Sequence, residues 1–360
     1  MEHFSCKTEI IAGAGAVSRL AELEAKRLLL VTDPFFQKNG TAQRVAAAAK
    51  AEAVEIFDRV SPDPSVELAA SGAARVKAFR PDLILALGGG SAMDCAKAMA
   101  YFGGGGYQLA AIPTTSGSGS EVTDFAILTH NGVKHPLVDE KLRPNLAILD
   151  SDLLQELPAG LIADTGFDVL AHALEACCGK NRSSFTDALA RDAFGMAFAA
   201  LPQSFAGDKS ARLPMHKAAT MAGLAFTQAG LGLCHALAHA LGGAFHVPHG
   251  RLNAILLPAV LECNASCAME AYAKMARTAG FASNADTMAF RAMKNGLIKL
   301  RRELGLPETL AQAGVDTRTL RQREQAIVEA ALADPCCETN PVRPEAHMVR
   351  TILSQVMGRE

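Results

Sequence analysis

The sequence lacks an excess of charge of either sign. Lys and Arg total 35 and Asp and Glu total 37 among 360 residues, so the formal net charge at pH 7 is −2. A chain without a strong overall field has no general means of attracting nucleic acid or an anionic membrane. We therefore expect neither nucleic acid nor a membrane among its partners.

The sequence also lacks the apolar segments that direct a chain to a membrane. Its start, MEHFSCKTEI, has no basic region followed by an apolar one. No uninterrupted apolar run approaches the roughly 18 residues of a membrane span. These absences favour a cytoplasmic protein.

Paired cysteines of the kind that form a disulfide framework are missing too. The nine cysteines are odd in number, and those at 177–178 and 336–337 are adjacent in sequence, where they bridge poorly. Cys263 and Cys267 are spaced i,i+4 but have no CxxC partner, so we interpret them as small buried hydrophobes rather than metal ligands. We expect reduced thiols.

What the sequence does have is a change of pattern near residue 156. Before it, short aliphatic runs alternate with helix-like stretches at 41–53 and 66–79, which is the βαβ rhythm of a mostly parallel sheet. After it, the strand signals stop and helical patterns continue. Because 360 residues are too many for one ordinary core, we predict two domains, α/β at 1–156 and all-α at 157–360. The strands are predicted at 27–33, 81–91, 107–115 and 144–150.

The first glycine-rich loop follows a predicted strand. In ILALGGGSAMDCAKA (84–98) an apolar run leads into three glycines and then a helix that Ser91 or Asp94 could cap. Glycine lets backbone N–H groups approach a phosphate, and a helix N-terminus favours an anion, so a diphosphate fits there. The segment contains neither GxGxxG nor GxxxxGK[ST], and an ordinary strand-to-helix turn explains it equally well.

A second loop, AAIPTTSGSGSEVTD (110–124), presents hydroxyl groups and glycines where another strand ends. Such a loop suits a nucleotide bound along the edge of a parallel sheet. Asp33, at the end of RLLLVTD, could accept hydrogen bonds from an adenosine ribose, and its charge would repel a 2′-phosphate. We therefore expect NAD rather than NADP, although a turn-capping role before Pro34 fits Asp33 as well.

Histidine is concentrated in one segment of the helical half. Four of the ten histidines lie in CHALAHALGGAFHVPHG (234–250), and upstream Asp168 and His172 stand an i,i+4 step apart on one helical face. One carboxylate and two or three imidazoles can bind a single divalent cation, and this ligation suits Fe(II) or Zn(II) acting as a Lewis acid. Spacing alone does not decide between His235 and His239, and His246 is a further candidate beside His249.

Five segments in register resemble the iron-dependent (group III) alcohol dehydrogenases and together span nearly the whole chain. They are GGGSAMDCAKA, IPTTSGSGSEVT, LPAGLIADTGFDVLAHALEA, GLGLCHALAHALGGAFHVPHG and ETNPVRP. Within that family, KHPLVD, SSFTDALA and MAGLAFTQAGLGL are most similar to the propanol dehydrogenases of propanediol-degrading microcompartments. The resemblance implies an N-terminal nucleotide-binding domain like that of dehydroquinate synthase, a helical C-terminal domain, an active site in the cleft between them, and a homodimer or larger assembly.

The resemblance also implies roles for individual residues. The implied metal ligands are Asp168, His172, His235 and His249, while His239 faces the nicotinamide and the substrate. The implied NAD(H)-binding residues are Asp33, Gly90, Ser91, Asp94, Thr114, Thr115, Thr123, Phe125, Lys134 and Leu153. Four residues depart from the common pattern of the family, namely Asp164, Phe167, Val169 and Arg251.

These observations predict reversible hydride transfer between NAD and a short primary alcohol, with propanol and propanal first among the substrates and iron, or else zinc, as the metal. A redox-neutral enzyme of the dehydroquinate synthase type would need clustered basic residues, and only Lys180, Arg182 and Arg251 lie near the ligands in sequence. A related glycerol or diol dehydrogenase is another alternative. A purely structural component is a third class, against which the intact ligand set argues. The implied partners are the alcohol or aldehyde, further copies of the chain and microcompartment components.

Overall fold

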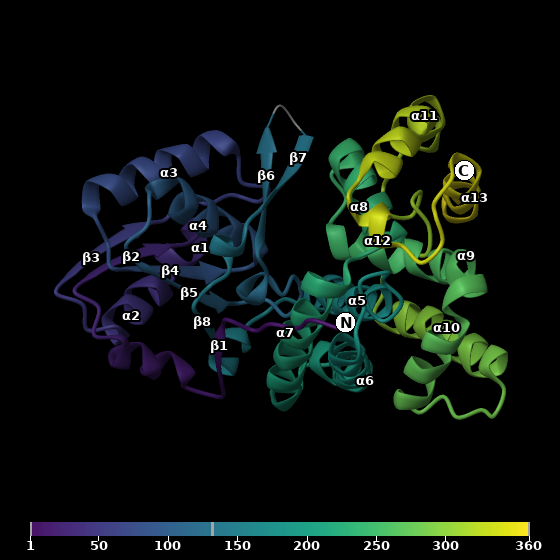
Figure 1. Cartoon of the computed structure of the whole chain (residues 1–360), viewed down its shortest axis with the longest axis horizontal. Helices are drawn as coiled ribbons and strands as arrows, with labels where there is room; N and C mark the ends of the chain where they lie inside the picture. The colour runs from purple at the N-terminus through teal and green to yellow at the C-terminus, as the bar shows by residue number, and fades with distance from the viewer. Residues whose placement is uncertain (1, 131–132, 359–360) are drawn as a thin grey trace. The chain divides into compact units, whose positions relative to one another are not determined.

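The structure is a computed structural model that describes residues 2–130 and 133–358. The chain divides into two compact units, Ser5–Glu156 and Leu157–Glu360, the second of which also includes Met1–Phe4. The first is an α/β unit and the second is helical, which confirms the predicted fold class (Figure 1). The division falls at the predicted change of pattern except for the first few residues. Phe4 stacks on Phe185 of the helical unit, with ring centroids 5.7 Å apart.

A six-stranded parallel sheet forms the centre of the α/β unit, in the order β1-β8-β5-β4-β2-β3 (Figure 1). The four predicted strands are present as β2, β4, β5 and β8. Two further strands at the sheet edges and an antiparallel hairpin, β6–β7, were not predicted. The strands are β1 (Glu9–Ala12), β2 (Arg27–Val31), β3 (Ala53–Phe57), β4 (Leu83–Gly88), β5 (Gln108–Pro113), β6 (Phe125–His130), β7 (Val133–Val138) and β8 (Leu146–Leu149).

Helices cover both faces of this sheet. Successive strand residues point to opposite sides, so Leu28 and Leu30 pack with one group of helices and Leu29 and Val31 with the other. Burial on both faces explains why the strands appear in the sequence as continuous apolar runs. One face carries η1 (Ala16–Leu23) and α2 (Thr41–Ala48), and the other carries α3 (Val66–Phe79) and α4 (Gly90–Gly103).

The predicted helical stretch at 41–53 is wrong beyond Ala48. Lys50 has a φ of 52°, a left-handed conformation that cannot continue a helix, and the chain then enters β3. Local alanine content favours helix, but pairing of β3 alongside β2 overrides that preference.

The described part of the C-terminal unit contains helices and connecting loops and no strand. Its longer helices pack pairwise, with α5 against α6, α7 and α9, and α8 against α9. The helices are α5 (Ala159–Ala176), α6 (Ser184–Phe205), α7 (Arg212–Ala229), α8 (Leu233–Phe245), α9 (His249–Thr278), α10 (Asp286–Glu303), α11 (Thr317–Ala333), α12 (Cys336–Thr339) and α13 (Ala346–Val356).

Helix α9 is long and apolar enough, by length and composition, to cross a membrane. This finding does not conflict with the absence of an uninterrupted apolar run of that length, because polar residues such as Arg251 and Asn253 interrupt α9. More than half of its most apolar stretch is buried within the protein. A buried core helix passes the same test, so this property is weak evidence for a membrane span.

Candidate functional site

Three helices bring the four predicted metal ligands to one point. The Oδ1 atom of Asp168 lies 3.8 Å from Nε2 of His172, 3.5 Å from Nε2 of His235 and 3.6 Å from Nε2 of His249. Asp168 and His172 are one turn apart on α5, His235 lies in the first turn of α8, and His249 begins α9. A divalent ion bonds such ligands at about 2.0–2.2 Å, which places neighbouring ligand atoms at separations of this size. The ligand atoms of Asp168, His172 and His235 all lie within 4.8 Å of one another and could hold a metal ion, and His249 contacts the same carboxylate oxygen.

The charges in this cluster also suit a cation. Burial alone would raise the pKa of Asp168, but attraction to the surrounding imidazoles lowers it below its ordinary value. Burial lowers the pKa of His172 to about 4 and that of His249 well below its ordinary value. For His235, hydrogen bonds with Asp168 and Glu175 outweigh burial and raise the pKa to about 9. An ionised carboxylate thus lies beside two neutral imidazoles, the form in which histidine binds metals, whereas His235 must release a proton when a metal binds.

Asn253 lies among the same ligand atoms and was missed by the sequence analysis. Its Nδ2 donates to Oδ1 of Asp168 at 2.7 Å and lies 3.3 Å from Nε2 of His235 and 3.2 Å from Nε2 of His249. The residue is fully buried, one helical turn beyond His249 on α9. Extending the helical face that begins at His249 would have found it.

His239 is one turn beyond His235 on α8, and its Nδ1 contacts a different carboxylate. Nδ1 lies 2.8 Å from Oδ2 of Asp334, and the His239 ring stacks on His249 with centroids 5.2 Å apart. Burial would raise the pKa of Asp334, but the hydrogen bond with His239 lowers it to about 2. The contact with Asp334 engages Nδ1 and leaves Nε2 as the ring nitrogen that another group can contact. His246 ends α8 with a φ of 56° and is exposed.

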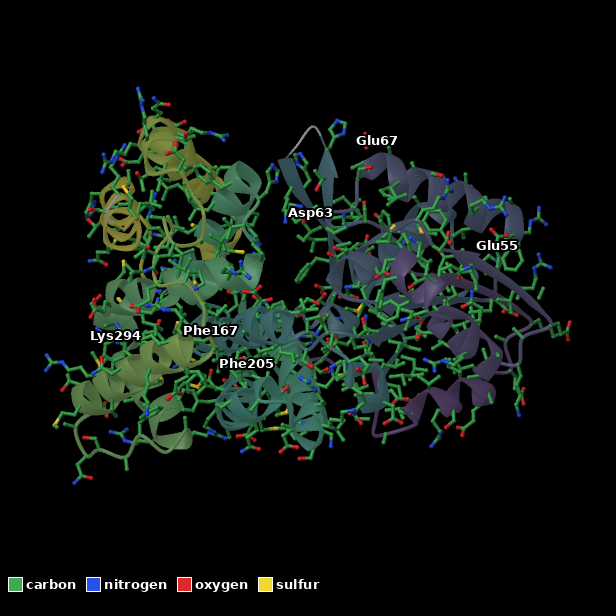
Figure 2. The ribbon with its side chains drawn as sticks, turned by 180° about the vertical axis from the view of Figure 1, so that it is seen from behind. Glu55, Asp63, Glu67, Phe167, Phe205 and Lys294 are labelled. Carbon is green, nitrogen blue, oxygen red and sulfur yellow. The ribbon has the colours of Figure 1, made fainter. Side chains whose placement is uncertain are left out.

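Two of the residues that depart from the family pattern pair with each other. Arg251 donates from Nε to Oδ1 of Asp164 at 3.1 Å and from Nη2 to Oδ2 at 3.0 Å. The other two, Phe167 and Val169, are fully buried in the helical core, where Figure 2 labels Phe167. None of the four departures displaces a predicted metal ligand.

The predicted cofactor loops in the α/β unit follow adjacent parallel strands and therefore lie together at the carboxyl ends of those strands. The two glycine-rich loops touch. A Cβ atom on Gly89 would lie 3.3 Å from Oγ1 of Thr115, and one on Gly90 would lie 3.2 Å from Oγ of Ser118. The predicted residues follow their strands in this way: Asp33 after β2, Gly90 and Ser91 after β4, Thr114 and Thr115 after β5, and Leu153 after β8.

Helix α4 begins without a side-chain cap among the described residues. Gly89 is its N-cap, so the expectation that Ser91 or Asp94 caps this helix is wrong. Asp94 instead accepts hydrogen bonds from Oγ of Ser120 at 2.7 Å and from the backbone N–H of Ile127 at 3.1 Å. Because the first amides of a helix have no intrahelical partner, this uncapped end of a 14-residue helix fits the phosphates of a dinucleotide.

Lys97 was not predicted, yet it positions two of the predicted cofactor residues. It is 1% exposed, and its Nζ donates to the carbonyl oxygens of Thr123 at 3.0 Å and Phe125 at 2.9 Å and to Oγ1 of Thr123 at 2.9 Å. Burial lowers its pKa to about 8, while the Asp94 carboxylate opposes that change. Lys97 thus fixes the segment that follows the second glycine-rich loop.

Asp33 and Lys134 both have partners within the protein. Oδ1 of Asp33 accepts from the backbone N–H groups of Phe35 at 2.8 Å and Phe36 at 3.2 Å, so the turn-capping role is present. Nζ of Lys134 pairs with Oδ1 of Asp63 at 2.7 Å, next to the β6–β7 hairpin (Figure 2). Their contacts with a cofactor stay predictions.

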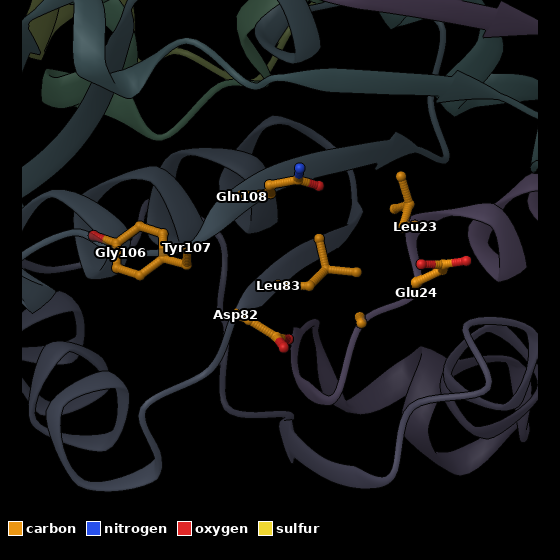
Figure 3. A pocket seen from close by; sticks show the side chains of 8 residues that line it. Leu23, Glu24, Asp82, Leu83, Gly106, Tyr107 and Gln108 are labelled. Atoms are coloured by element: carbon orange, nitrogen blue, oxygen red, sulfur yellow. The ribbon is translucent and has the colours of Figure 1, made fainter.

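A hollow of about 400 Å³ lies at the amino ends of the strands, where β2, β4 and β5 begin (Figure 3). It contains none of the predicted cofactor residues and is not part of the candidate site. Its lining residues are Leu23, Glu24, Ala25, Asp82, Leu83, Gly106, Tyr107 and Gln108.

Comparison with known proteins places this geometry in one family. The model of the iron-containing alcohol dehydrogenases matches residues 7–151, and that of the C-terminal part of the Fe-containing alcohol dehydrogenase family matches residues 162–357. The chain belongs to the iron-containing alcohol dehydrogenase family. It is an oxidoreductase that acts on CH–OH groups and interconverts alcohols and aldehydes.

Individual relatives are similar over their full length. The chain is 38% identical to 1-propanol dehydrogenase PduQ of Salmonella typhimurium, over 99% of this chain and 100% of that protein. It is 36% identical to an NADPH-dependent butanol dehydrogenase of Clostridium saccharobutylicum, over 95% and 94%. A solved structure of a 1,3-propanediol oxidoreductase matches with a TM-score of 0.93 and 31% identity, over 99% of this chain and 100% of that one.

Proposed function

We propose that the chain interconverts a short primary alcohol and its aldehyde, with propanol and propanal as the main pair, using NAD(H) and Fe(II). The observation that carries the proposal is the convergence of three imidazole nitrogens within 3.8 Å of one carboxylate oxygen. Zn(II) accepts the same ligands. The similarity to 1-propanol dehydrogenase PduQ over the full chain supports the choice of substrate.

The proposed ligands are Asp168, His172, His235 and His249. A metal held there supplies Lewis-acid chemistry to the substrate oxygen, and NAD(H) supplies or accepts the hydride. The protein's own part is to orient the substrate and move a proton. Nε2 of His239 is the proposed proton-exchanging atom, with Asp334 holding Nδ1 at 2.8 Å.

NAD(H) is proposed to bind at the carboxyl edge of the sheet. The uncapped start of α4 receives the diphosphate, and the contacting loops provide hydroxyl and backbone groups. Oδ1 of Asp33 caps α1 (Pro34–Lys38), which leaves Oδ2 available to a ribose hydroxyl. A carboxylate there opposes a 2′-phosphate, which favours NAD over NADP. The proposed contacts are Asp33, Gly90, Ser91, Asp94, Thr114, Thr115, Thr123, Phe125, Lys134 and Leu153.

A small uncharged substrate is favoured over a phosphorylated or acidic one by the contacts of the basic residues that lie near the proposed ligands in sequence. Arg251 is paired with Asp164, Nζ of Lys180 donates to the carbonyl oxygen of Glu338 at 3.2 Å, and Nη1 of Arg182 donates to that of Cys177 at 2.9 Å. Cations engaged in this way are poor candidates for binding an anionic substrate. This argues against the redox-neutral alternative.

The assembly and location of the protein are further parts of the proposal. We expect a homodimer or larger homo-oligomer in the cytoplasm, or inside a bacterial microcompartment with its other components. Family resemblance supports the oligomer, and the PduQ relatives support a role in propanediol degradation. Size-exclusion chromatography with light scattering measures the first, and co-fractionation with microcompartments tests the second.

The main experiment measures NADH oxidation with aldehydes of two to four carbons and metal content on the same anaerobically purified sample. The expected result is one divalent ion per chain and the highest kcat/KM with propanal. Absence of NADH oxidation with every aldehyde by fully metal-loaded protein would contradict the proposed substrate class.

A further inference from the structure

Glu175 extends the row of charged side chains on α5 beyond the two proposed ligands. It follows Asp168 and His172 at the 168, 172, 175 spacing, which keeps all three on one helical face. The residue is 3% exposed, and no lysine or arginine forms an ion pair with it in the described part of the chain. A buried carboxylate requires other partners.

Those partners are one imidazole and two backbone amides. Oε2 of Glu175 lies 2.6 Å from Nδ1 of His235 and accepts from the N–H of Gly232 at 2.9 Å, while Oε1 accepts from the N–H of Cys234 at 2.7 Å. The amides belong to the start of α8, where N–H groups have no intrahelical partner and the helix dipole is positive. Glu175 thus replaces the cap that the α8 sequence does not provide.

Asn340 completes the same arrangement and gives a role to the ETNPVRP segment. Its Oδ1 accepts from the N–H of Leu233 at 3.0 Å, and its amide exchanges hydrogen bonds with Asn264 of α9 at 2.8 and 2.9 Å. Gly232 allows this approach, since a Cβ there would lie 2.6 Å from Oδ1 of Asn340 and 2.8 Å from Oε1 of Glu175. Three successive amides at the start of α8 are therefore bonded by two buried side chains.

We propose that Glu175 is a positioning residue for the metal ligand His235, and that Asn340 supports it. By accepting the Nδ1 hydrogen, Glu175 fixes the tautomer whose lone pair is on Nε2, the atom 3.5 Å from Oδ1 of Asp168. By bonding the α8 amides, it also fixes the backbone that carries the ring. This inference rests on the proposed ligand set but not on the proposed substrate.

The test measures metal affinity rather than catalysis. Apo-protein is titrated with Co(II) against a chelator, and the absorption spectrum of the bound ion is recorded. Glu175→Gln is expected to weaken Co(II) binding by roughly 10- to 100-fold, the usual cost of losing an outer carboxylate, and to alter the spectrum. The matched control is Glu308→Gln, which removes a carboxylate that pairs with Arg301 and Arg302 instead; its Co(II) affinity should equal the wild-type value.

A double-mutant cycle with His235→Ala separates positioning from general destabilisation. If Glu175 acts through His235, Glu175→Gln should weaken binding less than about twofold when His235 is already absent. An equal loss in both backgrounds would overturn the inference, as would wild-type affinity in folded Glu175→Gln. Unchanged affinity in His235→Ala alone would instead refute the ligand set of the proposed function.

A second measurement uses the wild-type protein and so does not depend on the folding of a variant. Nitrogen-15 NMR of the histidines in Zn(II)-loaded protein reports which ring nitrogen of His235 carries hydrogen. The expected state has hydrogen on Nδ1 and the metal on Nε2. Coordination of His235 through Nδ1 would overturn the proposal.

Discussion

The two units build their candidate sites from different parts of the polypeptide. The sheet edge of the α/β unit offers backbone amides, glycines and hydroxyl groups from loops at strand ends. The proposed metal ligands of the helical unit include side chains fixed one helical turn apart, such as Asp168 and His172. The first arrangement depends on how closely chain segments approach, and the second depends on which side chains are present. Substitutions should therefore affect the two sites separately and by different mechanisms.

The largest effect is expected for His249→Ala, which removes a proposed ligand from the helical unit only. Bound metal and alcohol dehydrogenase activity should fall together, with activity reduced by about 10³-fold or more, because Lewis-acid stabilisation is lost. NADH binding, followed by the fluorescence of the nucleotide in a chain without tryptophan, should be unchanged. Full activity in this variant would contradict the ligand assignment.

A smaller loss is expected for His239→Ala. Metal content should stay at the wild-type level while kcat falls by about 10²-fold, because general acid–base groups contribute 10²- to 10⁴-fold. Asp334→Asn, which keeps the size of the side chain that holds Nδ1, should reduce kcat less. If His239→Ala lost its metal, His239 would be a ligand rather than a proton-exchanging residue.

Gly88→Ala is the converse test, because it changes the α/β unit and should leave the helical unit unaffected. Gly88 has a φ of 150°, and a Cβ there would lie 2.6 Å from that of Ala92, so the turn into α4 must shift. We expect KM for NADH to rise by about tenfold, which corresponds to roughly 1.4 kcal/mol, with metal content unchanged. Gly104→Ala is the matched control, since Gly104 also has a positive φ of 106° but an added Cβ meets no atom within 4 Å.

The smallest effect is expected for Asp33→Asn. Asparagine caps a helix about as well as aspartate, so the start of α1 and the thermal stability should be retained. Loss of the charge should raise the ratio of kcat/KM for NADPH to that for NADH by roughly tenfold or less. An unchanged ratio would show that Asp33 acts only as the cap of α1.

The sequence predicted the helical site in more detail than the sheet-edge site because helical spacing is regular. The i,i+4 step correctly placed Asp168 and His172 together, and the same regularity extends to Glu175 and Asn253, which were not predicted. Spacing could not separate His235 from His239. In the structure the two rings contact different carboxylates, Glu175 and Asp334, which come from distant parts of the chain.

At the sheet edge, the predictions located the loops but not their contacts. Buried parallel strands have an apolar signature, so β2, β4, β5 and β8 were found, whereas the exposed edge strand β1 was missed. Asp94 forms hydrogen bonds with Ser120 and Ile127, which are more than 25 residues away in sequence. The neighbouring sequence instead predicted that Asp94 could cap the start of α4. Lys97 was missed for the same reason.

The ion pair between Asp164 and Arg251 joins the residue one turn before the proposed ligand Asp168 to the residue two places after the proposed ligand His249. Without its partner, the Arg251 guanidinium would repel a divalent ion approaching the proposed ligands. Without its partner, the Asp164 carboxylate would add negative charge beside them. The opposite charges of the pair oppose each other's effect on the site. Anyone exchanging this region with that of another enzyme should transfer both residues as a unit.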